Sequence, residues 1–119
     1  MLKSDKEILE ELKNASTGLL VMSESDYPFE LIHWSGGNAI TPEYLCRVSE
    51  RPEDTPIEET DTKRFLGDNE RFRKLQAVIE SNLSDVKVYK VGTINIPVYI
   101  VGSSPEGNWL GVSTRLIQT

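Results

Sequence analysis

Few side chains in this sequence have the chemistry of a catalytic site. His33 is the only histidine and Cys46 the only cysteine, so a Cys-His nucleophile would need this one pair. A lone histidine in an apolar, strand-like run more often packs or faces solvent than acts as a base. Glu24 and Asp26 could approach a divalent ion, but two carboxylates alone make a poor site. With no Gly-rich phosphate loop, Cys/His metal spacing or nucleophile elbow, the sequence favours a protein that is not an enzyme and has no cofactor or metal of its own.

A second group of polar side chains is concentrated in residues 22–30. Here Met22-Ser23-Glu24-Ser25-Asp26-Tyr27-Pro28-Phe29-Glu30 separates an apolar run from a strand-like run. The carboxylates stay charged at neutral pH and are costly to bury without partners. Tyr27 precedes a proline, which restricts its backbone to extended conformations. The stretch therefore predicts a short, stiffened loop that presents Glu24 to a partner.

The run from Gly18 to Glu30 resembles the signature stretch of the nuclease A inhibitor family. Members are small acidic bacterial proteins that block a non-specific, metal-dependent DNA/RNA nuclease. The resemblance continues through the N-terminal helical pattern, through residues 72–83 and into the tail 102–119. One departure is the segment 48–68, which contains no Trp or Tyr, whereas the family carries an aromatic side chain before its long helix that helps to grip the nuclease.

This resemblance implies the site. It implies that Glu24 enters the nuclease active site near the catalytic divalent metal, and that Thr119 reaches the same place with its hydroxyl or terminal carboxylate. A pocket built for phosphodiesters favours negative oxygens beside its metal, and neither group offers a bond to cleave. The residues expected to form the surrounding rim are Ser23, Ser25, Asp26 and Tyr27. The alternative is a binding module on the same scaffold with a different protein partner.

Charge and composition limit the possible partners. Residues 1–61 hold 14 acidic and 5 basic side chains, whereas residues 62–119 hold 5 acidic and 8 basic ones, for a net charge of −6. An acidic half argues against direct contact with nucleic acid and suits a basic protein partner, although excess acid can also serve solubility alone. The sequence has no run near the roughly 20 apolar residues of a membrane span, so no membrane contact is expected. The single cysteine predicts a reducing compartment, and the N-terminus carries acids and lacks the apolar run of a signal peptide. Both features predict a cytoplasmic protein with no secretory signal.

Hydrophobic periodicity predicts the elements that carry these residues. Residues 5–17 have helical spacing between the capping-box pattern at Ser4 and a glycine at 18. Short apolar strands are expected at 19–22 and 29–34. A short helix is expected from Thr41-Pro42, and a core-facing helix from Asp68. Residues 51–62 are acidic and contain proline, which favours a linker or surface loop.

The C-terminal half alternates with period two. Residues 86–101 and 110–117 predict strands in an antiparallel meander, with Gly92 at a turn. Pro97 lacks an N–H donor and indicates an edge strand or a bulge. A length of 119 residues suits one domain, residues 1–119. The pattern predicts an α+β fold, and the resemblance implies a single-domain three-layer α-β-α sandwich around a mainly antiparallel sheet.

Overall fold

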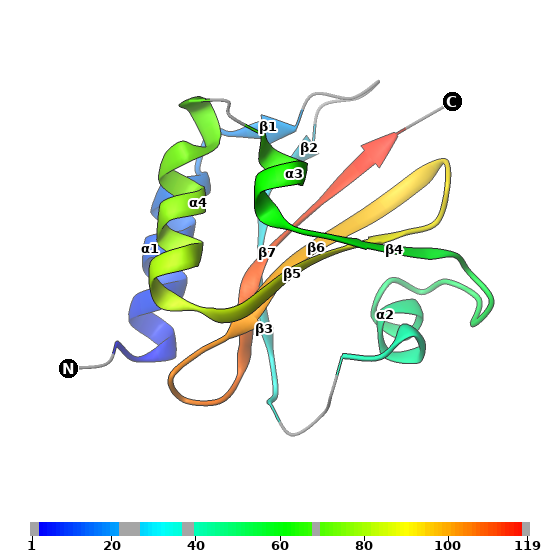
Figure 1. Ribbon diagram of the computed structural model, residues 1–119, viewed down its shortest axis with the longest axis horizontal. Coiled ribbons are helices and arrows are strands. Elements are labelled where there is room, and N and C mark those ends of the chain that lie inside the picture. The colour runs from blue at the N-terminus through cyan, green and yellow to red at the C-terminus, as the bar shows by residue number, and fades with distance from the viewer. Residues whose placement is uncertain (1–2, 22–26, 37–39, 68–69, 118–119) are drawn as a thin grey trace.

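The alternating apolar runs of the C-terminal half form the centre of a five-stranded antiparallel sheet (Figure 1). The computed structural model describes residues 3–21, 27–36, 40–67 and 70–117. The strand order in the sheet is β3-β7-β6-β5-β4. The bounds are β3 (Glu30–Trp34), β4 (Ile57–Thr60), β5 (Ser84–Val91), β6 (Asn95–Ser103) and β7 (Trp109–Ile117). The predicted meander is β5-β6-β7, and Gly92 in the first turn has φ of 98°, which glycine adopts without steric cost.

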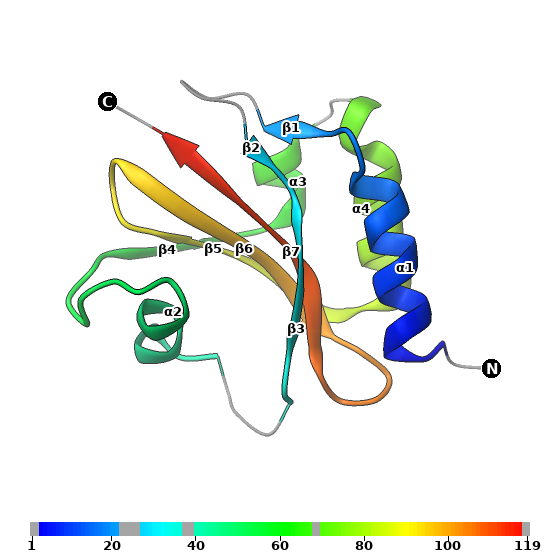
Figure 2. The same cartoon turned by 180° about the vertical axis from the view of Figure 1, so that it is seen from behind.

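Two amphipathic helices, α1 (Asp5–Ser16) and α4 (Glu70–Asn82), cover one face of this sheet. α1 begins as predicted, because the Ser4 side chain accepts a hydrogen bond from the Glu7 N–H, and Gly18 beyond its end has φ of 81°. Figure 2 shows both helices on the same side of the strands. Their apolar stripes and the inward residues of the strands form one core. It includes Ile8, Leu12, Leu75, Ile79, Val88, Val98, Ile100, Leu110 and Val112.

The other face of the sheet carries the short helix α2 (Pro42–Val48). Successive side chains of a strand point to opposite faces, so Tyr99 faces away from the core that holds its neighbours in β6. Trp34 packs between Tyr99 and Tyr44 of α2, with ring centroids 5.3 and 5.2 Å away. Thr41 caps α2 by accepting a hydrogen bond from the Tyr44 N–H at 3.1 Å, as predicted. Trp34 is therefore a packing residue of this second face.

The predicted α+β class and the mainly antiparallel sheet are confirmed. Helices on both faces agree with an α-β-α arrangement. Because the second face carries the seven-residue α2, the full three-layer sandwich stays a prediction. Among the described helices, none combines the length and the apolar character that a bilayer crossing requires.

The prediction that residues 51–62 form a linker or surface loop is confirmed for residues 51–56 and was wrong for the rest. This segment contains β4, which pairs with β5, and it leads into a short helix, α3 (Thr62–Leu66), whose N-cap is Asp61. The segment forms an edge strand despite its acidic composition, because two of its carboxylates lie beside lysines of β5. Lys90 Nζ lies 3.3 Å from Glu58 Oε2, and Lys87 Nζ lies 3.8 Å from Glu59 Oε1. The predicted start of the long helix at Asp68 lies outside the described residues.

Pro97 also differs from its prediction, since β6 is a central strand between β5 and β7. On one side Pro97 is paired with Arg115 of β7. On the other side the ladder with β5 ends at the pair Lys90 and Val98, and Val98 is the residue that follows the proline. A proline fits this central strand because the β5 ladder stops before its missing donor.

Candidate functional site

The acidic segment 22–26 connects the two strands of a small hairpin. These are β1 (Leu20–Val21) and β2 (Tyr27–Pro28), paired antiparallel with Val21 opposite Tyr27. β2 leads directly into β3, and β3 runs antiparallel to β7 with Glu30 opposite Ser113. Residues that precede Glu30 therefore run beside residues that follow Ser113. As a result, the hairpin lies at the end of the molecule toward which β7 runs (Figures 1 and 2).

Two contacts fix the base of the hairpin to the sheet and to the helices. The buried Thr114 hydroxyl donates a hydrogen bond to the Pro28 carbonyl at 3.1 Å. The Phe29 ring packs edge-on against Phe72 of α4, with centroids 6.0 Å apart. An extended, hydrogen-bonded base of this kind limits the directions in which the connecting segment can leave.

The structure tests only part of the predicted site. Tyr27 lies in β2, as expected for a residue before proline. The other predicted contact residues lie outside the described residues; they are Ser23, Glu24, Ser25, Asp26 and Thr119. Their proposed roles remain predictions. The described neighbours Val21, Tyr27 and Ile117 show where the chain enters and leaves these segments.

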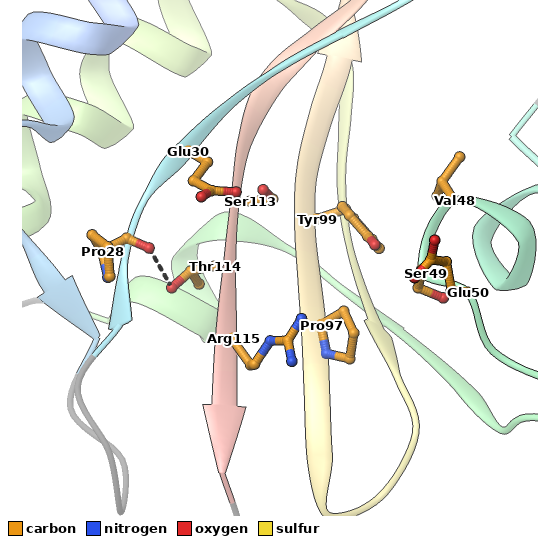
Figure 3. Close-up of a pocket in the computed structure, with 10 residues that line it drawn as sticks. All are labelled: Pro28, Glu30, Val48, Ser49, Glu50, Pro97, Tyr99, Ser113, Thr114 and Arg115. Carbon is orange, nitrogen blue, oxygen red and sulfur yellow. Dashed lines mark hydrogen bonds between the residues drawn. The ribbon is translucent and has the colours of Figure 1, made fainter.

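Beside the hairpin, the α2 face of the sheet is hollowed into a groove of about 480 Å³. Pro97 and Tyr99 of β6 and Ser113 of β7 lie along it (Figure 3). Glu30 of β3 borders one side, and the end of α2 borders the other with Glu50. The residues that line the groove are Pro28, Glu30, Val48, Ser49, Glu50, Pro97, Tyr99, Ser113, Thr114 and Arg115. The groove is thus part apolar and part charged, with the carboxylates of Glu30 and Glu50 and the guanidinium of Arg115 in its lining, and it reaches the hairpin at Pro28.

The titratable groups of the groove differ in their surroundings. Burial raises the pKa of the Tyr99 hydroxyl above its ordinary value, although its hydrogen bond with Ser49 and the charge of Arg115 act in the opposite sense. Tyr99 is therefore a neutral hydroxyl at physiological pH. The Arg115 guanidinium donates through Nη1 to Asn95 Oδ1 at 3.2 Å. Glu30 and Glu50 are exposed, and they form no ion pair within the described part of the chain.

His33 and Cys46 have different partners. His33 Nε2 lies 3.3 Å from Asp5 Oδ2 at the start of α1. Cys46 is buried in α2, and its thiol lies 3.9 Å from the Glu53 carbonyl oxygen. Within the described residues, His33 thus joins β3 to the start of α1, and Cys46 packs inside α2. Across residues 3–21, 27–36, 40–67 and 70–117, no group of three or more His, Cys, Asp and Glu side chains is placed to hold a metal ion.

Sequence reasoning did not find the groove. Its residues come from β2, β3, β6, β7 and α2 together with the residues that follow α2, and only the sheet register brings Glu30, Ser113 and Tyr99 into one row. One signal was available. In β7 the polar Ser113 and Arg115 alternate with the buried Val112 and Leu116, which marks the face that the long helices do not cover.

The fold and these surfaces define a small α+β protein built on an antiparallel sheet, with an acidic connection at one end. The chain belongs to the nuclease A inhibitor-like family, whose model matches residues 6–69 and 67–119. Comparison with curated proteins gives no match. This is the family that the sequence resemblance in residues 18–30 and in the tail predicted.

Proposed function

We propose that this protein inhibits a metal-dependent, sugar-non-specific DNA/RNA nuclease by plugging its active site with the acidic segment and the chain end. Glu24 supplies a carboxylate, and Thr119 supplies its hydroxyl or terminal carboxylate, near the catalytic divalent metal of the nuclease. Ser23, Ser25, Asp26 and Tyr27 form the rim. The inhibitor needs no cofactor or metal of its own and touches no nucleic acid or membrane.

One observation carries the proposal: the base of the hairpin and the end of β7 lie together. Val21 and Tyr27 face each other, Pro28 is bonded to Thr114, and β7 ends at Ile117 on that side. The acidic segment starts from the same region, which supports the proposal that Glu24 and Thr119 enter one pocket.

The chemistry suits a cleft that binds phosphodiesters. Such a cleft has a divalent cation and basic side chains arranged for negative oxygens. A carboxylate that replaces a phosphate satisfies these groups but leaves nothing to hydrolyse. General acidity of the surface would contribute less to affinity than two inserted groups. An exposed charge pair contributes about 0–1 kcal/mol, whereas truncating one member of a buried charged pair costs about 2–5 kcal/mol.

The family membership supports a nuclease as the partner. We propose further that residues 1–119 act as one domain and that the protein works in the cytoplasm, where it would neutralise the nuclease before that enzyme reaches its own compartment. A different protein partner on the same scaffold is the competing function.

The test is a titration of the protein into a Mg²⁺-dependent, sugar-non-specific nuclease from the same source, with Mg²⁺ in large excess. Inhibition should saturate at one inhibitor per enzyme on both DNA and RNA. Loss of inhibition when Mg²⁺ is raised would indicate chelation, and full activity at excess protein would favour the competing function.

A further inference from the structure

We propose that Thr114 is a positioning residue for inhibition. Its hydroxyl holds the base of the β1–β2 hairpin against β7, so that the acidic segment and the end of the chain are presented to a partner in one fixed relation. Identification of that partner as a nuclease rests on the proposed function. The contact itself lies within the described residues.

The backbone ladder that joins β3 to β7 ends before the hairpin. Its last pair on that side is Glu30 with Ser113, one residue before Thr114. From there β2 pairs with β1 instead, over two residues of each strand. A two-stranded ladder of this length has little stability of its own in water. The hairpin therefore depends on side-chain contacts for a defined orientation.

Thr114 bridges the point at which the ladder ends. Its hydroxyl donates a hydrogen bond to the Pro28 carbonyl at 3.1 Å (Figure 3). The next residue, Phe29, packs edge-on against Phe72 of α4, and both strands of the hairpin contact β7. At this step the hydroxyl satisfies a backbone carbonyl that a longer ladder would otherwise have paired.

Thr114 occupies a position at which an apolar side chain would serve for packing alone. It lies between Val112 and Leu116 in the row of β7 side chains that faces the long helices, and it pairs with Val98 of β6. These three neighbours belong to the hydrophobic core, and Thr114 itself is 9% exposed. Valine has nearly the same shape and avoids the cost of placing a hydroxyl among apolar groups. The hydrogen bond to Pro28 explains why a threonine is suited to this position.

β7 links this contact to the end of the chain. Thr114 lies three residues before Ile117, where β7 ends, and Tyr27 on the other side of the contact leads into the segment 22–26. One hydrogen bond therefore joins the strand that carries the C-terminus to the strand that carries the acidic segment. A loose hairpin would hold the binding orientation for only a fraction of the time, and the apparent affinity would fall by that fraction.

The first experiment measures the hairpin in the free protein, without a nuclease. Amide hydrogen exchange of Val21 and Tyr27, the paired residues of the hairpin, is compared in wild type and in Thr114→Val. We expect the variant to speed exchange at both amides by about threefold or more, because local opening no longer breaks the hydrogen bond to Pro28. Unchanged exchange at these amides would overturn the positioning role.

Two further variants separate position from stability. Thr114→Ser keeps the hydroxyl and should leave the exchange of the hairpin amides within about twofold of wild type. Thr41→Val removes a hydroxyl whose hydrogen bond has the same length, 3.1 Å to the Tyr44 N–H, at the N-cap of α2. It should lower the urea midpoint and leave the hairpin amides unchanged. Equal acceleration by Thr41→Val, or no recovery with serine, would contradict the assignment.

The second experiment measures nuclease inhibition by the same proteins. We expect Thr114→Val to raise the inhibition constant about threefold or more, and Thr114→Ser and Thr41→Val to leave it near the wild-type value. Faster hairpin exchange with an unchanged inhibition constant would overturn the positioning role. If wild-type protein inhibits no nuclease, the proposed function fails, and the exchange experiment still decides whether Thr114 holds the hairpin.

A double-variant cycle tests whether Thr114 acts through the acidic segment. In combination with Glu24→Gln, the effect of Thr114→Val on inhibition should shrink, because the group that is being positioned has lost its charge. In combination with Glu10→Gln, the same change at an exposed position of α1, the effect should stay whole. Full additivity with Glu24→Gln would show that Thr114 affects inhibition by another route, and the proposal would fail.

Discussion

Glu24 carries the largest predicted effect of any single side chain on inhibition. Replacement by Gln keeps the size of the side chain and removes the charge that would face the metal of the nuclease. We expect Glu24→Gln to weaken inhibition by about 2 kcal/mol or more, which is roughly thirtyfold, with no change in unfolding. Inhibition constants and urea midpoints of the variant are compared with those of Glu10→Gln. Equal inhibition by both variants would remove Glu24 from the mechanism.

Asp5 is a buried carboxylate that joins the start of α1 to β3 and to the turn between β6 and β7. Its Oδ2 accepts a hydrogen bond from Asn108 Nδ2 at 2.7 Å and lies near His33, and its own N–H donates to Glu106 Oε2 at 2.7 Å. Asn108 in turn accepts from the Gly36 N–H at 3.0 Å. Burial alone would raise the pKa of Asp5, but the hydrogen bonds around it, including those of Asn108 and His33, outweigh burial and lower the pKa below its ordinary value.

The lowered pKa predicts a pH dependence of stability. An acid whose pKa is lower in the folded protein adds stability above its unfolded pKa of about 3.9, and this stability is lost as the pH falls through the folded pKa. Asp5→Asn should therefore cost about 1–3 kcal/mol at pH 7 and much less at pH 3. Urea unfolding of both proteins at pH 7, 5 and 3 measures the difference. A difference that does not shrink toward pH 3 would show that the charge of Asp5 is not what stabilises the link.

At the level of elements, the sequence correctly predicted the helices and strands that are specified by signals within their own stretch of chain. α1 and α2 have their caps and apolar faces within one stretch, and the meander β5-β6-β7 has strong alternation with a glycine turn. β4 and Pro97 were misread because their structure depends on a neighbour. β4 forms because β5 offers an unpaired edge, and Pro97 is accommodated because the β5 ladder ends before it.

The same distinction applies to the site. Residues 22–26 are contiguous, so their composition alone predicted a presented loop; they lie outside the described residues, and the loop stays a prediction. The groove could not be predicted, because residues far apart in the sequence meet there through the register of three strands and the packing of α2 on Trp34. Neither the register nor that packing can be read from one stretch.

Gly111 of β7 lies where the backbone of the neighbouring strand β6 approaches closely. It is paired with Ile32 on one side and Val101 on the other, and a Cβ at this position would lie 1.8 Å from the Ile100 carbonyl oxygen. Gly111→Ala must therefore displace backbone, and we expect a loss of about 2 kcal/mol or more in the free energy of unfolding. Ser113→Ala, in the same strand but half-exposed, should change it by less than about 0.5 kcal/mol. Similar urea midpoints for the two variants would show that the strands adjust without strain.

At the level of the whole molecule, the Asp5 link and the base of the hairpin lie at different ends. The Asp5 link joins α1, β3 and the β6–β7 turn at one end, where its hydrogen bonds serve stability. The hairpin base and the last residues of β7 lie at the other end (Figures 1 and 2). The molecule extends over 44 × 34 × 19 Å, and we expect a change at one of these ends to leave the other intact.

This separation gives the last prediction, which concerns the two ends of the chain. A peptide tag fused after Thr119 removes the terminal carboxylate and places extra residues beyond β7, on the side of the hairpin. A tag before Met1 leads into α1, whose first turn lies at the far end. We expect the C-terminal tag to raise the inhibition constant about tenfold or more and the N-terminal tag to leave it unchanged, because under the proposed function only the C-terminal end of the chain would enter the pocket of the nuclease. Proteolytic removal of the C-terminal tag should restore inhibition. Equal potency of the two tagged proteins would exclude the chain end from the contact and leave the acidic segment to act alone.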